Sequence, residues 1–236
     1  NDAWGTKIWS EYYHSFEQVP QPGPAPFLHN SSLSTMYQLF SMEKIAQFAD
    51  DQAEIIRKYS SSPITHNSSV FFSVDNERLF QNLDFASFDT YATIDNFPAY
   101  LINSDLWRNL KKDRPFWVME TSPSYAASLA SYASPHPNGY LKVEAAAAYA
   151  LGAEAFCYWL WRQQRSGCEQ PHGSVLSAWG KPTIGYQNVL EVEAIRKEIE
   201  PVIVSTKPSQ AEVAITYSDR SKVFLKTEPH RSLNHR

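Results

Sequence analysis

Acidic, aromatic and amide side chains follow the apolar segments of this sequence. A run of large apolar residues leads directly to Glu120 in the string FWVMETSPS. A second apolar segment ends on Asp89 and Tyr91, and a third is followed by Glu169 and His172. Carboxylates and imidazoles hydrogen-bond hydroxyl groups, and aromatic rings stack on the apolar faces of sugars. This mixture of residue types indicates a carbohydrate site.

Each of these residues also has a purely structural interpretation. A glutamate before Thr-Ser-Pro is favoured at a helix start, where negative charge is stabilised. Tyr91 fits a core tyrosine with a bonded hydroxyl group, and Trp9 fits ordinary core packing. Glu169 and His172 fit solvated loop residues. What favours a common site is the shared position of these residues at or after the ends of apolar segments.

The elements that must position these side chains alternate between helix and strand. A long helix with Ser34 as its N-cap is predicted first, because apolar residues from Met36 to Ile56 recur at helical spacing. The predicted helix–strand units are 35–58 with 63–67, 75–82 with 83–91, 98–111 with 115–120, and 140–151 with 155–161. The predicted strands are largely continuously apolar, which is typical of parallel strands covered on both faces.

Four such units are half of an eight-stranded α/β barrel, which typically needs about 250 residues. The predicted fold class is therefore α/β, a TIM-barrel fragment followed by the start of a second α/β domain. The alternative is an open doubly wound sheet, but the chain contains no GxGxxG phosphate loop. Residues 186–200 are predicted as a helix broken by Pro201, and 211–218 as the first strand of the second domain. The predicted domains are thus 1–200 and 201–236.

Composition argues against several other classes of function. The net charge of −4 gives no support for a nucleic-acid partner, and no apolar run approaches the roughly 20 residues of a membrane helix. Cys157 and Cys168 form no CxxC pair, and the histidines are scattered, so we expect neither a metal nor a cofactor. A serine hydrolase is disfavoured because no GxSxG occurs. The chain begins without Met or a signal peptide, which indicates a fragment cut at both ends; a cytoplasmic location is favoured.

Three strings, AWGTKIWSEYY, PFWVMETSPS and WLWRQQRSGCEQPHGSVL, resemble in this order the family-42 glycoside hydrolases, the bacterial beta-galactosidases. The resemblance implies an eight-stranded barrel, of which this chain holds strands five to eight, and a following α/β domain involved in homotrimer contacts. It also implies hydrolysis of terminal beta-D-galactosides with retention of configuration.

The resemblance further implies roles for particular residues. Glu120, in the pattern M-E-x-S-P, corresponds to the nucleophile at the end of the seventh strand. The expected substrate-binding residues are Trp9, Asn67, Tyr91, Glu169 and His172, with Tyr91 also holding the Glu120 carboxylate. The general acid/base, a glutamate at the end of the fourth strand, is expected upstream of residue 1. We therefore expect the chain by itself to be inactive.

Two other functions stay open at this point. One is a sugar-binding relative that has lost catalysis, and the other is a barrel glycosidase with a different sugar preference. Two departures from the family pattern bear on sugar preference: no Trp follows the nucleophile segment before Trp159, and Cys168 stands where an aromatic residue often precedes the late glutamate.

Overall fold

The computed structural model describes residues 12–23, 30–207, 209 and 211–227, so Trp9 lies outside the described residues. The chain divides into two compact units. The first comprises Asn1–Ser61, Val70–Asn82 and Thr216–Arg236, and the second comprises Ser62–Ser69 and Leu83–Ile215.

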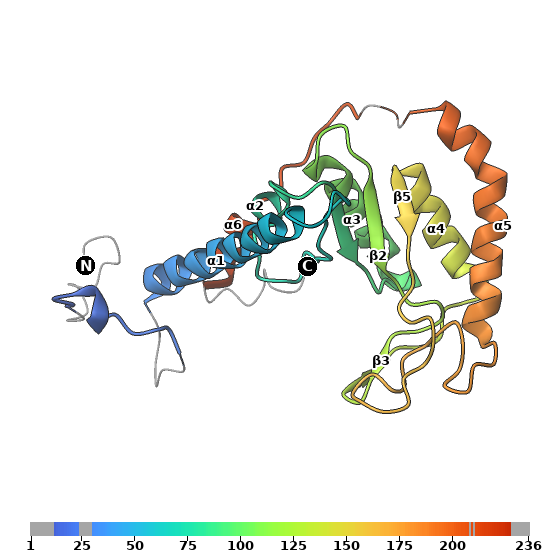
Figure 1. Ribbon diagram of the computed structural model, residues 1–236, viewed down its shortest axis with the longest axis horizontal. Helices are drawn as coiled ribbons and strands as arrows, with labels where there is room; N and C mark the ends of the chain where they lie inside the picture. Colours follow the sequence, from blue (N-terminus) through green and yellow to red (C-terminus); the bar gives the residue numbers. More distant parts are fainter. Residues whose placement is uncertain (1–11, 24–29, 208, 210, 228–236) are drawn as a thin grey trace. The chain divides into compact units, whose positions relative to one another are not determined.

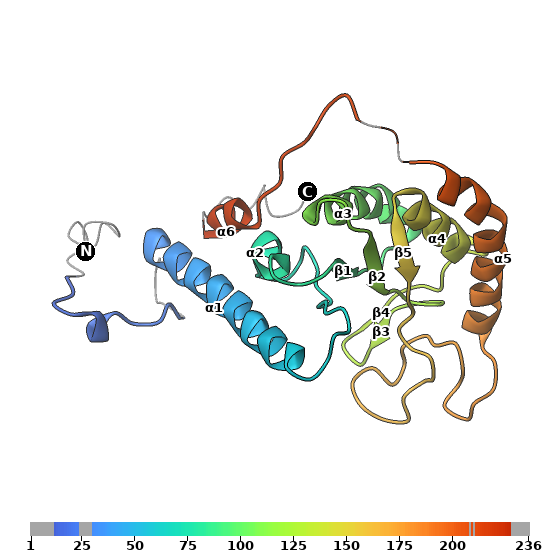
Figure 2. The same cartoon turned by 45° about the horizontal axis from the view of Figure 1, so that its top comes forward.

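The second unit is built on a parallel sheet with the strand order β1-β2-β5 (Figure 2). Its strands are β1 (Ala86–Asp89), β2 (Phe116–Glu120) and β5 (Ala153–Phe156). Helix α3 (Phe97–Leu110), preceded by the short η3 (Ile94–Asn96), connects β1 to β2, and α4 (Tyr140–Ala150) connects β2 to β5. Helical crossovers of this kind join parallel strands. The predicted alternation of helix and strand is confirmed for these elements.

Apolar side chains on one face of the sheet form the core of this unit. Phe88, Phe116 and Val118 expose at most 1% of their surface. The ring of Phe88 stacks on Trp107 of α3 with ring centroids 5.3 Å apart. Burying each such side chain stabilises the fold by about 1.5–3 kcal/mol, an upper estimate. Trp117 points to the opposite face, because successive strand residues alternate. The core thus holds the middle of β2 rigidly, and this rigid strand in turn positions the residue at its end.

The predicted strand at 63–67 is wrong. This segment runs beside β1, but side chains bind the backbone groups that a neighbouring strand would use. The Asp84 carboxylate accepts the backbone N–H of Ile64 at 2.7 Å, and the Ser87 hydroxyl donates to the His66 carbonyl at 3.1 Å. A regular ladder therefore does not form, although the segment is held in place.

Two observed strands are shorter than the apolar segments that predicted them. Strand β1 occupies 86–89 of the predicted 83–91, and β5 begins before the predicted residue 155 and ends at Phe156. The β1–β2 pairing shifts register between Phe88 and Asp89. Apolar composition reports burial, whereas a strand also needs a paired backbone, so the apolar sequence continues past the ladder.

Helix α5 (Ile184–Ser205) contradicts the predicted break at Pro201, because the helix continues through that residue. Proline removes one backbone donor, and here it lies in the last turns of a long helix. The predicted domain boundary after residue 200 falls inside α5 and stays a prediction. The predicted strand at 211–218 is also wrong: this segment is irregular, and Val213 and Ile215 are 79% and 92% exposed. Alternating apolar residues form a strand only when a neighbour pairs with them.

The described part of the first unit is helical. Helix α1 (Ser31–Arg57) packs against α2 (Asn76–Phe80) and α6 (Asp219–Thr227), and η2 (Phe16–Gln18) precedes them. The N-cap of α1 is Asn30, whose side chain accepts the backbone N–H of Leu33 at 3.0 Å, so the helix starts earlier than the predicted cap at Ser34. The buried residues of α1 include Leu33 and Met42 as well as Ala46, Ala49 and Ala53.

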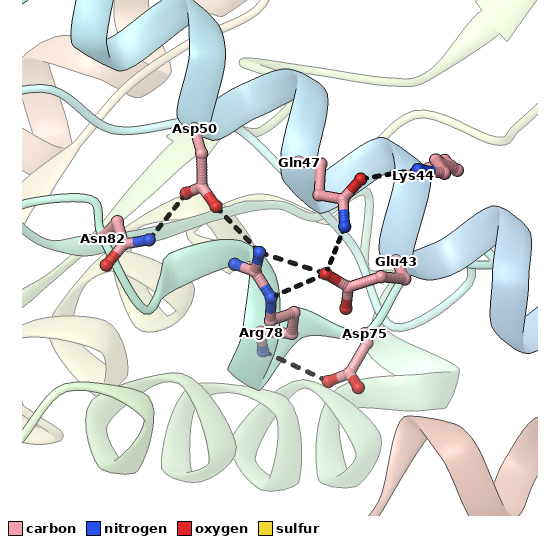
Figure 3. A network of polar contacts seen from close by, with 7 residues as sticks. All are labelled: Glu43, Lys44, Gln47, Asp50, Asp75, Arg78 and Asn82. Atoms are coloured by element: carbon pink, nitrogen blue, oxygen red, sulfur yellow. Dashed lines mark hydrogen bonds and ion pairs between the residues drawn. The ribbon is translucent and has the colours of Figure 1, made fainter.

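Polar contacts join the three helices of this unit. Arg78 of α2 forms ion pairs with Glu43 and Asp50 of α1, at 3.2 and 2.8 Å (Figure 3). The buried Asp219 at the start of α6 accepts hydrogen bonds from the backbone and side chain of Asn76, at 3.0 and 2.8 Å. These contacts tie segments far apart in the sequence into one unit.

In the second unit, the loops that follow β2 and β5 gather at the carboxyl end of the sheet (Figure 1). They include the hairpin of β3 (Ala127–Ser128) and β4 (Ser131–Tyr132), and Leu129 in its turn donates to the Cys168 carbonyl at 2.6 Å. None of the described helices is long and apolar enough to cross a membrane. The described residues also contain no group of His, Cys, Asp or Glu side chains arranged to hold a metal ion.

Candidate active site at the carboxyl end of β2

Glu120 is the last residue of β2, and its backbone is held from both sides. Its carbonyl accepts the backbone N–H of Thr90 at 2.8 Å, and the next residue, Thr121, donates to the Cys157 carbonyl at 3.1 Å. The side chain is half-buried at the strand end. The sheet therefore fixes the backbone position of Glu120, and neighbouring side chains need only orient its carboxylate.

Each oxygen of the Glu120 carboxylate accepts a hydrogen bond from a different element. The Tyr91 hydroxyl donates to Oε2 at 2.6 Å, and the Asn67 amide donates Nδ2–H to Oε1 at 3.2 Å. Burial and the negative charge of Glu120 raise the pKa of Tyr91, so its phenol remains a donor. Hydrogen bonds to both oxygens restrict the rotation of this carboxylate. The expected contact between Tyr91 and Glu120 is present.

Asp89, which the sequence placed at the end of an apolar segment without assigning it a role, is a neighbour of Glu120. It lies opposite Glu120 in the β1–β2 register, and its Oδ2 accepts from the same Asn67 amide nitrogen at 2.9 Å. Burial, and then the charge of Glu120, raise the pKa of Asp89 to about 7. The signal available in the sequence was its place at the end of the same apolar segment as Tyr91.

His172 is buried and reaches the same cluster, contrary to its interpretation as a solvated loop residue. Its ring packs edge-on against Tyr91 with centroids 5.6 Å apart. Its Nδ1 lies 2.9 Å from the Gly173 carbonyl oxygen. Because a carbonyl only accepts, Nδ1 carries the hydrogen, and the other nitrogen, Nε2, is an acceptor in the neutral ring.

The backbone of Glu169 is bonded to His172 of the cluster, and its side chain is bonded to a tryptophan. Its carbonyl accepts the backbone N–H of His172 at 2.9 Å, and its Oε2 accepts from Nε1 of Trp159 at 3.2 Å. Trp159 is a second residue that the sequence did not single out; the peptide bond that follows it is cis. The guanidinium of Arg162, by contrast, donates two hydrogen bonds to the Ala178 carbonyl, at 2.8 and 3.2 Å.

A glycine lets the loop that follows β2 and the loop that carries His172 approach closely. The backbone N–H of Gly173 donates to the Tyr125 carbonyl at 3.1 Å. A methyl group at Gly173 would clash with the Ser124 side chain and the Tyr125 backbone. The absence of a side chain at this position is therefore a condition for bringing the two loops together.

Four of the five predicted substrate-binding residues thus lie in one cluster with Glu120: Asn67, Tyr91, Glu169 and His172. The fifth, Trp9, lies outside the described residues. The cluster presents carboxylate, amide, imidazole and phenol groups on one end of a parallel sheet. That arrangement suits recognition of a polyhydroxylated ligand next to one oriented carboxylate.

Comparison with known proteins gives a family for this arrangement. Residues 1–199 match the model of the family Glyco_hydro_42, described as beta-galactosidase. The chain belongs to this family. It is 73% identical over 236 residues to beta-galactosidase YesZ of Bacillus subtilis, covering 100% of this chain and 36% of that protein. It is 29% identical over 249 residues to a beta-galactosidase of Thermus thermophilus, covering 97% of this chain and 38% of that protein.

Solved structures of the family share its fold. The beta-galactosidase of Halorubrum lacusprofundi superposes with a TM-score of 0.81 at 28% identity, over 98% of this chain and 36% of that one. The beta-galactosidase of Bacillus circulans sp. alkalophilus superposes with a TM-score of 0.85 at 23% identity, over 100% and 36%. The chain thus has an α/β glycosidase fold, and it spans 36% of the length of the first relatives it matches.

Proposed function

We propose that residues 1–236 are part of a glycoside hydrolase that cleaves terminal beta-D-galactosides with retention of configuration. In this proposal β1, β2 and β5 are the sixth, seventh and eighth strands of a TIM barrel, and 62–69 occupies the place of the fifth. Residues 201–236 begin the domain that follows the barrel, and the whole protein assembles as a homotrimer.

The observation that carries the proposal is the pair of donors on Glu120. A nucleophilic carboxylate must be ionised and aimed at the anomeric carbon, and the bonds from Tyr91 and Asn67 serve both needs. Retaining enzymes place a second carboxyl group about 5–5.5 Å away to protonate the leaving oxygen. We assign that role to a glutamate outside residues 1–236.

Each turnover then has two steps. Glu120 attacks the anomeric carbon while the leaving oxygen takes a proton from the second carboxyl group, which forms a galactosyl ester. Water, deprotonated by the same group, then attacks the anomeric carbon and releases Glu120 as a carboxylate. Glu169 and His172, with Trp9, bind the galactose ring during both steps.

Azide rescue tests the nucleophile directly. In the full-length protein, Glu120→Gly should abolish turnover of an activated aryl beta-galactoside. Added azide should restore it and give the alpha-galactosyl azide, because the small anion enters the space vacated by the carboxylate. Glu198→Gly, at an exposed position on α5, is the control and should behave as wild type with or without azide. A beta-configured azide, or no rescue with retained sugar binding, would contradict the assignment.

The chain alone should not turn over substrate, because it would lack the proton donor. General acid catalysis contributes about 10²–10⁴-fold, and loss of the rest of the barrel removes further contacts. The measurement is hydrolysis of nitrophenyl beta-galactoside by purified residues 1–236 from a host lacking its own galactosidase. The non-catalytic alternative is distinguished by the full-length protein, which would then bind galactose without turnover.

A further inference from the structure

Asp89 and Glu120 share a single amide donor, an arrangement that the proposed mechanism does not use. Nδ2 of Asn67 lies 2.9 Å from Asp89 Oδ2 and 3.2 Å from Glu120 Oε1, so its two N–H bonds reach the two carboxyl groups. The other oxygen of Asp89, Oδ1, is buried and has no hydrogen-bond partner in the described part of the chain. In Asp89, therefore, Oδ1 is buried without a partner, and Oδ2 accepts from an amide nitrogen that also serves Glu120.

This geometry disfavours two charges on the pair. Like-charged carboxyl groups that share a site do not both ionise at the usual pH, and a buried oxygen without a partner penalises the charged form more than the neutral one. Burial and the charge of Glu120 together raise the pKa of Asp89 to about 7. Glu120 has a donor on each oxygen, whereas Asp89 has one on Oδ2 alone.

The groups around Asp89 leave Glu120 as its main charged neighbour. Tyr91, which follows β1, is a neutral donor to Glu120. On the segment 62–69, Asn67 is neutral and His66 is exposed. On the loop after β5, the His172 ring contacts Tyr91, and the charge of Glu169 acts on Tyr91.

We propose that Asp89 is a positioning residue for Glu120: it keeps the proton of the carboxyl pair and holds the Asn67 amide against the ionised nucleophile. If Asp89 loses that proton, its own negative charge attracts the Asn67 amide more strongly, and the bond from Asn67 to Glu120 weakens. This inference rests on the proposed function for its catalytic consequence, but not for the coupling between the two carboxyl groups.

The coupling can be measured without turnover. In full-length protein labelled with ¹³C at the aspartate carboxyl carbons, one signal should titrate near pH 7 and disappear in Asp89→Asn. In Glu120→Gln the same signal should titrate at lower pH, because the like charge is gone. Asp105→Asn, at an exposed ion pair with Arg108, is the matched control and should leave the signal in place.

Activity supplies the second readout. Asp89→Ala should lower kcat by about 10–10²-fold with a small change in KM, since orientation of the nucleophile rather than sugar binding is lost. Asp89→Asn keeps an acceptor for Asn67 and should recover most of that loss. Its kcat should also fall less than the wild-type kcat does between pH 6 and pH 8, because the residue that ionises is no longer present.

The outcomes separate this inference from the proposed function. An Asp89 signal that titrates near pH 4, or one that does not move in Glu120→Gln, overturns the inference even if azide rescues Glu120→Gly. A coupled titration without azide rescue overturns the proposed nucleophile and, with it, the catalytic role of Asp89. If Asp89→Asn does not fold, the wild-type and Glu120→Gln titrations still decide the coupling.

Discussion

Two glutamates lie on either side of the end of β2, in opposite surroundings. Glu120 is at the half-exposed carboxyl end of the strand, where each of its oxygens has a donor. Glu144 comes from α4 and is fully buried behind the strand, where its Oε1 accepts from the Thr121 hydroxyl at 2.9 Å. Its Oε2 has no partner among the described residues.

The difference shows how surroundings assign roles to identical side chains. Burial raises the pKa of Glu144 to about 8, so this residue is mainly protonated at neutral pH. A neutral carboxyl group can bind Thr121 and pack in the core, but it offers no charge. Glu120 keeps access to solvent and to donors, which suits an ionised nucleophile.

The largest expected difference is in turnover of the full-length protein. Glu120→Gln should lower kcat by at least about 10⁴-fold, because a neutral amide does not form the galactosyl ester. Glu144→Gln, which preserves the shape of a protonated glutamate, should leave kcat within about threefold. Steady-state kinetics on an aryl beta-galactoside measure both, with mass spectrometry to exclude deamidation. Equal losses of kcat in Glu120→Gln and Glu144→Gln would show that the two glutamates do not differ in catalytic role.

A pair of tyrosines tests the same contrast with single hydroxyl groups. Tyr91→Phe removes the 2.6 Å bond to Glu120 and should lower kcat by about 10²–10³-fold, as expected for loss of a donor to a reacting group. Tyr100→Phe removes a buried bond of 2.9 Å to the Glu144 carbonyl. It should lower the free energy of unfolding by about 1–3 kcal/mol and leave kcat nearly unchanged. Kinetics and denaturant unfolding on both variants decide this, and a stability loss in place of a rate loss for Tyr91→Phe would count against its role.

The pH dependence of stability should report Glu144. Its pKa is 4.5 ordinarily and about 8 when folded, so the folded state binds more protons between these pH values. The resulting stabilisation is complete below pH 4.5 and is lost as the pH rises through 8. Glu144→Gln should therefore match wild type near pH 5 and exceed it near pH 9, on the order of a few kcal/mol. If the free energy of unfolding changes with pH by the same amount in the two proteins, Glu144 is not protonated in the folded core.

The smallest effect is expected at an exposed carboxylate. Hydrogen bonds from Arg196 and Lys197 lower the pKa of Glu193 on α5 to about 2, but the side chain remains open to solvent. Arg196→Ala should change the Tm by less than about 1 °C, and 1 M salt should erase the difference. Calorimetry at low and high salt measures it. A large, salt-independent change would place this ion pair among the structural contacts instead.

Sequence patterns predicted the positions of helices and apolar segments better than they predicted which segments pair as strands. The crossovers between β1, β2 and β5 followed from apolar segments separated by helical ones. The strands predicted at 63–67 and 211–218 failed, because pairing depends on a neighbour that a local pattern does not contain. Pro201 also failed as a helix breaker, because α5 continues through it to Ser205 although the proline removes one backbone donor.

By itself, the sequence determined that Glu120 ends a buried strand and that hydroxyl-binding residues follow the neighbouring apolar segments. Those are local properties, set by side-chain type and order. Only the tertiary structure decided which groups meet: Asn67 between two carboxyl groups, His172 buried against Tyr91, and Glu144 sealed behind the strand. The charge state of a carboxyl group follows from these contacts, because its pKa depends on its neighbours and on its access to water. Neither is a property of the residue type alone.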